Sequence, residues 1–332
     1  MTSSLAPVLR ADRRRGPRTG PFIARSVEPL LPIRLIALDI DGTLVDDDLA
    51  LRDRTVTAIR RALRHGIHVS LVTGRMTSSA TRFAETLGLS GPVIGYQGAL
   101  IREMPSQRGG AGRLLHHWPL QPLAAQAAVI WSREHGLDPH LNHLERLVIR
   151  DDDPRVDDYS AFLGARATRV PDLAAWIQKP VTKVVAVGPP DLPASLLDEA
   201  RATFAGRADA TVAHPRFLEF VAPGVSKGAA IRWLARRAGV PMGAVMAIGD
   251  QLNDFEMLAA AGHGVAMPSA PEAVRNVARY EAPPLAVEGA AQMIERLALA
   301  TPREAAAASR DLAAEATAKR GTPADPVADP EP

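Results

Sequence analysis

The chain has 332 residues, of which 46% are hydrophobic and 23% charged, so it is long enough for two domains and has an ordinary globular composition. It contains no cysteine, which excludes disulfide-stabilised scaffolds, thiolate metal sites and cysteine nucleophiles. The formal net charge is only +2, and no apolar stretch reaches the roughly 18 residues of a membrane span, so we expect a cytoplasmic protein without a membrane partner.

The two ends of the chain differ in charge from the segment between them. Residues 1–34 hold seven arginines and two acidic side chains, whereas residues 301–332 hold four basic and six acidic ones. Residues 1–32, rich in arginine and proline, show no hydrophobic periodicity and are expected to form a disordered tail. Residues 300–332, rich in alanine, glutamate and proline, are expected to form a second tail, with a marginal helix over Arg303–Lys319.

Binding of nucleic acid through the basic tail is the weaker interpretation of this charge. The segment between the tails is nearly neutral, and its tryptophans are not interleaved with basic residues as base stacking requires. We therefore predict no nucleic-acid partner. A non-catalytic binder that uses the basic tail stays open as an alternative, and the sequence indicates no oligomeric state.

Predicted strands and helices alternate after the first tail. The apolar run Ile33–Ile40 predicts a strand, the helical spacing of Arg54–His65 predicts a helix, and His68–Val72 predicts a second strand. A helix over Ala80–Leu87 and a strand over Pro92–Ile94 follow. This order is typical of βαβ units in a parallel sheet.

The middle of the chain has a different pattern. Short apolar runs and helical stretches come with hairpin-like turns, which indicates an α+β insertion. Strands are expected at 114–118, 147–149, 181–187 and 216–221, and helices at 123–134 and 192–204.

The βαβ pattern returns after residue 222. Helices are expected over 227–238 and 254–261, and strands over 244–248 and 264–266. Because both ends share one pattern, residues 33–99 and 222–299 are predicted to form a discontinuous core, and residues 100–221 an inserted α+β domain. The predicted fold class is α/β, with a Rossmann-like, doubly wound parallel sheet in the core.

Polar residues follow the first two predicted strands. Asp39 and Asp41 come directly after the first strand, and their i, i+2 spacing points both carboxylates to one side of an extended chain. Thr73 and Gly74 follow the second strand and place a hydroxyl and backbone amides where an anion can bind. Open α/β sheets bind ligands at the carboxyl ends of their strands, so these residues are candidates for one site.

Two further motifs lie near the other end of the core. Lys227 opens a predicted helix, where a cation is unfavourable unless an anion is nearby. Gly249-Asp250 and Asn253-Asp254 follow the strand over 244–248 and supply hard oxygen ligands that suit Mg²⁺. Each motif alone is also compatible with an ordinary turn or helix cap, whereas together they predict a phosphate and metal site.

In this order the motifs resemble the haloacid dehalogenase (HAD) superfamily, and within it the Cof-type, subclass IIB sugar-phosphatase-like hydrolases. The matching segments are Asp39-Ile-Asp41-Gly-Thr, Thr73-Gly-Arg, Lys227, and Gly249-Asp250 with Asn253-Asp254. The resemblance runs from about residue 33 to about residue 297. Only 31 residues separate Asp41 from Thr73, but 153 separate Thr73 from Lys227, so the insertion lies where that group carries an α/β cap.

The resemblance implies a phosphatase with a covalent intermediate. Asp39 would attack phosphorus, and Asp41 would protonate the leaving alkoxide and then activate water. Mg²⁺ would be held by the Asp39 carboxylate, the Asp41 backbone carbonyl and Asp250. The remaining implied roles are phosphate binding by Ile40, Thr73, Gly74, Lys227 and Asn253, with Asp254 in support beside Lys227 or a metal-bound water.

The resemblance also implies what the cap does and where this chain departs from the family. The family usually has asparagine before Gly98, and Gln97 stands there, so an altered contact at the junction of core and cap is expected. The expected function is Mg²⁺-dependent hydrolysis of small phosphorylated metabolites, with sugar phosphates favoured and a phosphosugar mutase as the alternative. Candidate specificity residues in the cap are Arg102, His116, His117, His140, Asn142 and His143.

Overall fold

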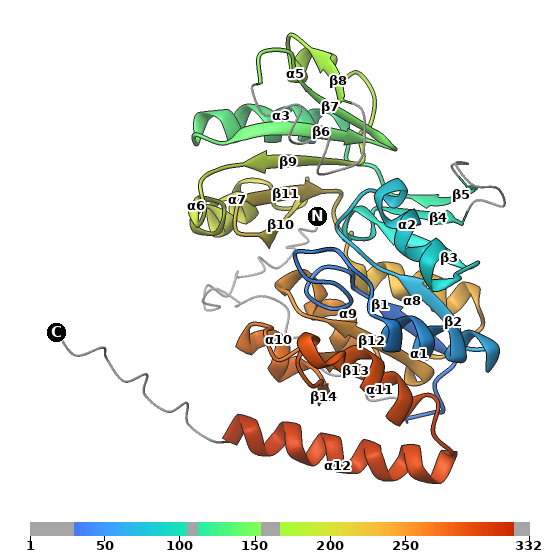
Figure 1. Cartoon of the computed structure of the whole chain (residues 1–332). Helices are drawn as coiled ribbons and strands as arrows, with labels where there is room; N and C mark the ends of the chain where they lie inside the picture. The colour runs from blue at the N-terminus through green and yellow to red at the C-terminus, as the bar shows by residue number, and fades with distance from the viewer. Residues whose placement is uncertain (1–29, 105–111, 154–166, 322–332) are drawn as a thin grey trace, which may run out of the picture.

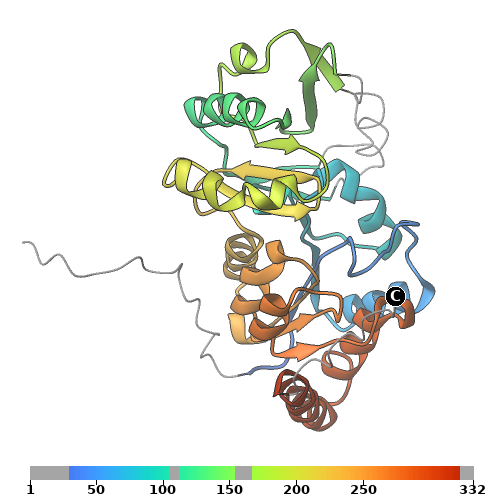
Figure 2. The ribbon, with the colours of Figure 1, turned by 90° about the vertical axis from the view of Figure 1, so that its left-hand side faces the viewer.

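The computed structural model of the chain describes residues 30–104, 112–153 and 167–321 (Figure 1). Most of the predicted first tail (residues 1–29) and the end of the second (residues 322–332) lie outside the described residues. The described chain forms two bodies, one above the other in Figures 1 and 2, and each is built on its own β-sheet.

The lower body, the core, is built on a parallel five-stranded sheet with the order β14-β13-β12-β1-β2. Its strands are β1 (Leu35–Leu38), β2 (His68–Leu71), β12 (Val245–Gly249), β13 (His263–Ala266) and β14 (Tyr280–Glu281). The inner strand β1 pairs with β2, its neighbour in sequence, and with β12 from the other end of the chain. The predicted doubly wound α/β fold is confirmed by this topology.

Helices cover both faces of the core sheet. All four residues of β1 are apolar, and this two-sided cover buries them. The covering helices are α1 (Asp53–Arg64), α2 (Thr77–Leu87), α8 (Lys227–Arg237), α9 (Phe255–Ala260), α10 (Glu272–Val277) and α11 (Gly289–Leu297). Ile36 and Leu38 of β1 pack with α1, α2 and α11. Leu35 and Ala37 pack with α8, α9 and α10, as the alternation of side chains along a strand requires.

A three-stranded antiparallel sheet adjoins the core beyond β2. Its strands are β3 (Pro92–Gly95), β4 (Leu100–Glu103) and β5 (Leu114–His117). A parallel bridge between Val72 and Ile94 joins β3 to the end of β2. Strand β4, expected in the insertion, is therefore hydrogen-bonded to β3 of the predicted core, and β5 is hydrogen-bonded to β4. The division of the chain at residues 99 and 222 stays a prediction.

The upper body is built on a six-stranded sheet, here called the cap sheet, with the order β10-β11-β9-β6-β7-β8. Its strands are β6 (Asp138–His143), β7 (Arg146–Arg150), β8 (Ala167–Val170), β9 (Lys183–Val187), β10 (Asp209–His214) and β11 (Phe217–Val221). The helices on one face are α3 (Pro122–Glu134), α5 (Leu173–Trp176), α6 (Leu192–Ser195) and α7 (Leu197–Thr203). The helix predicted over 192–204 is divided into α6 and α7 at Leu196.

Helix α12 (Pro302–Gly321) follows the core and runs along its lower edge in Figure 1. The helix predicted over Arg303–Lys319 is present in α12, but it is not a solvated tail, because Leu312 and Ala316, one turn apart, are buried against the core. The hydroxyls of Ser309 and Tyr280 are 2.6 Å apart, which anchors the same face of the helix. The apolar stripe is short and alanine-rich, so its burial was not evident from the sequence. Although α12 has 20 residues, neither it nor any other helix in the described part of the chain combines the length and hydropathy needed to cross a membrane.

The packing of α12 leads to a first testable prediction. Replacing Leu312 with alanine removes buried methyl groups and is expected to lower the free energy of unfolding by about 2–3 kcal/mol, measured by urea denaturation. Glu315→Ala on the exposed face of the same helix is the control and is expected to change it by no more than about 0.5 kcal/mol. Equal unfolding midpoints for wild type and Leu312→Ala would contradict the packing of α12.

Candidate active site

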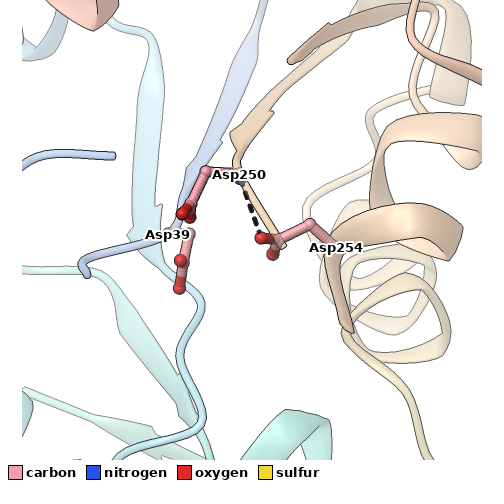
Figure 3. Close-up of side chains that lie close together, drawn as sticks. All are labelled: Asp39, Asp250 and Asp254. Carbon is pink, nitrogen blue, oxygen red and sulfur yellow. Dashed lines mark hydrogen bonds between the residues drawn. The ribbon is translucent and has the colours of Figure 1, made fainter. Parts of the chain in front are cut away.

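Three buried carboxylates meet at the carboxyl edge of the core sheet (Figure 3). Asp39 follows β1, Asp250 follows β12, and Asp254 ends the short helix η3 (Leu252–Asp254). Because β1 and β12 are neighbouring parallel strands, the residues just after them lie side by side. One oxygen of each carboxylate lies within 4.8 Å of the others, and each residue is at most 4% exposed.

Lys227 is the cation of this cluster. It is the first residue of α8, which Ser226 caps by accepting a hydrogen bond from the amide of Ala229. Its Nζ donates to Oδ1 of Asp39 at 2.8 Å and to Oδ1 of Asp254 at 2.7 Å. Burial disfavours the ammonium, but the charges of Asp254 and Asp39 outweigh burial and raise the pKa of Lys227. The two carboxylates compensate a cation that would otherwise be unfavourable at the positive end of a helix.

Asp254 also holds the loop after β12 in place. Its Oδ2 accepts hydrogen bonds from the backbone amides of Asp250 and Gln251, both at 3.0 Å. A Cβ on Gly249 would lie 2.4 Å from Cγ of Asp254, so glycine permits this close approach. The motif of Gly249-Asp250 and Asn253-Asp254 is therefore a compact turn, in which the Asp254 carboxylate contacts both the backbone and Lys227.

The cluster carries more negative than positive charge. Burial and then the charge of Asp254 raise the pKa of Asp39, and the same two causes raise the pKa of Asp250 to about 6. With all groups ionised, three carboxylates face one ammonium, an excess of two negative charges in a buried place. Hard carboxylate oxygens with such an excess are a donor set that fits Mg²⁺. Gly42, at a φ of +76°, brings the backbone close to Asp250, where a Cβ would lie 2.2 Å from Oδ2.

The side chain of Asp41 lies outside this cluster. It is 49% exposed and forms an ion pair with Arg75, whose Nε donates to Oδ2 at 2.7 Å and whose Nη2 donates to Oδ1. Sequence reasoning missed this role of Arg75, although the residue belongs to the Thr-Gly-Arg motif. The two partners are 34 positions apart, so only the parallel pairing of β1 and β2 brings them together.

The residues expected to bind phosphate lie at the same edge of the core sheet. Ile40 and Thr73 are at most 1% exposed. Gly74 and Asn253 line a cleft beside Asp39, whereas Lys227 lies beneath it against the carboxylates. Their phosphate-binding roles stay predictions.

The cleft has a volume of about 750 Å³ and lies between the core and the cap sheet, large enough for a small metabolite. The lining on the core side includes Asp39, Asp41, Gly74, Arg75, Gln97 and Asn253. The lining on the cap side includes His140, Asn142, Lys183, Val185, His214, Phe217 and Glu219. The cap residues come from four neighbouring strands and occupy the face opposite the apolar core of the cap sheet.

Two of the six expected specificity residues, His140 and Asn142, line this cleft. The other four lie elsewhere: Arg102 pairs with Glu145, His116 packs on Trp118, His117 contacts Thr182, and His143 packs near Trp176. Sequence reasoning did not assign Lys183 and Glu219 to the site. Each is a single charged residue in an apolar strand, which was the available signal.

Comparisons with known proteins agree with this geometry. A family model described as haloacid dehalogenase-like hydrolase matches residues 36–294. An HMP-PP phosphatase of Cronobacter sakazakii is 31% identical over 71% of this chain and 85% of its own length. A 5-amino-6-(5-phospho-D-ribitylamino)uracil phosphatase of Bacillus subtilis is 28% identical over 74% of this chain and 90% of its own length. The crystal structure of a haloacid dehalogenase-like hydrolase from Bacteroides thetaiotaomicron matches with a TM-score of 0.68 and 27% identity, covering 80% of this chain and 99% of the other.

Proposed function

Because the chain belongs to the haloacid dehalogenase-like hydrolases of the Cof type and is a phosphatase of that superfamily, we propose that it hydrolyses small phosphorylated metabolites with Mg²⁺ through an aspartyl phosphate on Asp39. The observation that carries this proposal is the buried carboxylate of Asp39, held by Lys227 beside Asp250 at the edge of a cleft. A phosphate dianion repels nucleophiles, so a site for its transfer must above all neutralise charge and fix geometry.

In the first step an oxygen of Asp39 forms a bond to phosphorus while the bond from phosphorus to the ester oxygen breaks, and Asp41 gives a proton to the leaving alkoxide. In the second step water forms the new bond to phosphorus, the bond to Asp39 breaks, and Asp41 takes up the proton. Arg75 fixes the position of the Asp41 carboxyl group at the cleft, as the carboxylate that takes up the proton of water in the second step. Lys227 neutralises charge on Asp39 and fixes the direction of its oxygen.

Bound Mg²⁺ would supply positive charge to the transferring phosphate oxygens. In our proposal Asp39, the backbone carbonyl of Asp41 and Asp250 hold it, and Asp254 stays with Lys227. The excess of negative charge among the three carboxylates supports this assignment. Phosphate oxygens would bind the amides of Ile40 and Gly74, the hydroxyl of Thr73 and the side chain of Asn253.

The raised pKa of Asp250 leads to a prediction about pH and metal binding. Its ordinary value is 3.8 and its value in the folded protein about 6, so the folded, metal-free protein keeps a proton that the unfolded chain releases between these values. Stability from this proton is present at low pH and is lost as pH rises through about 6. Mg²⁺ binds the ionised form of Asp250, so the stabilisation that Mg²⁺ provides increases as pH rises.

We expect MgCl₂ at a fixed millimolar concentration to raise the Tm most above about pH 7, and the increase to fall steeply by about pH 5, where roughly a tenth of Asp250 is ionised. Differential scanning fluorimetry measures this without any substrate. Asp250→Asn is expected to lose the Mg²⁺ effect at every pH. An increase in Tm that is equal at both pH values would contradict the assignment of Asp250 as a ligand.

The cap side of the cleft is proposed to receive the leaving group. Val185 and Phe217 offer apolar surface, and His140 and Asn142 offer polar groups, which suits a compound with both kinds of surface. Phosphorylated sugars are the favoured class. The relatives are named as phosphatases of HMP-PP and of 5-amino-6-(5-phospho-D-ribitylamino)uracil, so both compounds belong in the substrate panel.

Release of inorganic phosphate from this panel and from p-nitrophenyl phosphate, with MgCl₂ and with EDTA, tests the proposed function. We expect release that requires Mg²⁺. Transfer of phosphate between positions of a sugar without release would instead indicate a mutase. No reaction with any ester would contradict the proposal.

A further inference from the structure

A chain of hydrogen bonds joins the cap sheet to two loops of the core. Lys183 on β9 donates to Oε1 of Glu219 on β11 at 2.6 Å and to the carbonyl oxygen of Gly74 at 3.0 Å. Oε2 of Glu219 accepts a hydrogen bond from Nε2 of Gln97 at 2.7 Å. Oε1 of Gln97 accepts one from Nδ2 of Asn253 at 2.9 Å. The loop after β2 and the loop after β12 are thereby connected through side chains of the cap.

The charged residues of this chain of hydrogen bonds, Lys183 and Glu219, set the direction of each hydrogen bond. An ammonium only donates and an ionised carboxylate only accepts, so Glu219 receives hydrogen bonds from both Lys183 and Gln97. Gln97 must turn its nitrogen to Glu219 and therefore its oxygen to Asn253. Asn253 must then turn its nitrogen to Gln97, and the second hydrogen of that nitrogen is left for another acceptor.

Gln97 occupies a constrained position between the two bodies. It is 3% exposed and lies in η1 (Tyr96–Gly98) at a φ of +61°, a conformation that glutamine rarely adopts. A Cβ on Gly74 would lie 2.4 Å from Nε2 of Gln97, so the amide packs directly on the loop after β2. Within the described ranges, the bond to Gln97 is the hydrogen bond that holds the Asn253 carboxamide, because Oδ1 of Asn253 is buried without a partner.

We infer that Gln97 is a positioning residue that couples the docking of the cap sheet to the orientation of Asn253. With Glu219 in place, Gln97 holds the Asn253 nitrogen in the orientation that suits a phosphate oxygen. When the cap sheet moves away, Gln97 loses its acceptor Glu219. The remaining hydrogen bond between Gln97 and Asn253 then does not determine which of the two carboxamides offers its nitrogen and which its oxygen. The inference rests on the proposed function, in which Asn253 contacts phosphate, and Gln97 acts through Asn253 without touching the reacting atoms.

Gln97→Asn tests this coupling. Asparagine tolerates a positive φ better than glutamine, but its side chain is one methylene shorter and cannot reach both Glu219 and Asn253. We expect an unchanged or higher Tm, a kcat/KM for p-nitrophenyl phosphate that falls about tenfold or more, and a higher inhibition constant for inorganic phosphate. Gln121→Asn, at an exposed position before α3, is the control and is expected to change none of these.

A double-mutant cycle separates positioning from a general structural role. Asn253→Ala is expected to raise the inhibition constant of inorganic phosphate in the wild-type background and to add little in the Gln97→Asn background. Independent effects that multiply would overturn the inference. A Gln97→Asn variant with the kcat/KM of the wild type would overturn it as well.

Glu219→Gln is a second variant that keeps the inference testable if Gln97→Asn does not fold. The substitution preserves the shape of the side chain, but Lys183 still only donates and takes the oxygen of the carboxamide. The nitrogen of the carboxamide then faces Gln97, so the direction of the hydrogen bonds to Gln97 and Asn253 is reversed. The effect of Asn253→Ala on phosphate inhibition is expected to shrink in this background too, and full retention of that effect would contradict the inference. Phosphate release by the wild type is measured first, because its absence would contradict the proposed function instead.

Discussion

Replacing Asp39 with asparagine is expected to reduce phosphate release by about 10⁴-fold or more while the fold stays intact. The amide keeps the shape of the carboxylate and still offers an oxygen to Lys227, but it is not a nucleophile. Burial and the neighbouring Asp254 raise the pKa of Asp39, so removal of this charge is expected to leave the Tm unchanged or higher. Phosphate release and thermal unfolding of the same preparation measure both effects.

Asp198→Asn is the matched control for this substitution. The side chain of Asp198 lies on α7 and is 99% exposed, so the same chemical change there is expected to leave activity and Tm as in the wild type. Turnover by Asp39→Asn within about tenfold of the wild type would contradict the assignment of the nucleophile.

The second large effect is expected from Lys227→Met. Methionine fills a similar volume but leaves Asp39 and Asp254 buried without their cation. We expect the free energy of unfolding, measured in urea with EDTA present, to fall by about 3–5 kcal/mol, and kcat to fall by about 10²-fold or more. Lys319→Met, at an exposed ion pair with Glu281, is the control and is expected to cost at most about 1 kcal/mol.

A double variant distinguishes loss of charge balance from loss of packing. Adding Asp254→Asn to Lys227→Met removes one of the unpaired charges, so part of the lost stability is expected to return while activity does not. A Lys227→Met variant as stable as the wild type near pH 7.5 would show that the buried carboxylates do not depend on this cation.

Sequence patterns predicted the parts of the site that depend on local order along the chain. Asp39 and Asp250 each follow a short, wholly apolar strand, and parallel strands place their carboxyl ends at one edge, so their meeting follows from the pattern. Lys227 was a candidate because a lysine at a helix start is unfavourable without an anion, and the family resemblance gave it a phosphate-binding role. In the structure Asp39 and Asp254 are the anions beside it. These inferences need strand direction but no knowledge of side-chain packing.

Contacts between distant segments were not predictable in the same way. The pairing of Arg75 with Asp41 and the contact of Gln97 with Glu219 join loops whose relative placement depends on both sheets. Strands β4 and β5 have only four residues each, so periodicity could not show whether they extend β3 or join the cap sheet. The packing of α12 rests on Leu312 and a few alanines, a signal too weak to separate from that of a solvated helix.

Trapping of a covalent phosphoenzyme tests the central assignment most directly. Wild-type protein mixed with a reactive phosphate ester and MgCl₂ is quenched in acid within one turnover, reduced with borohydride and digested for mass spectrometry. We predict conversion of Asp39 to homoserine in the wild type, through reduction of its acyl phosphate, and no conversion in Asp39→Asn. Phosphate release without conversion of Asp39, or with conversion of another carboxylate such as Asp41 or Asp250, would contradict Asp39 as the nucleophile.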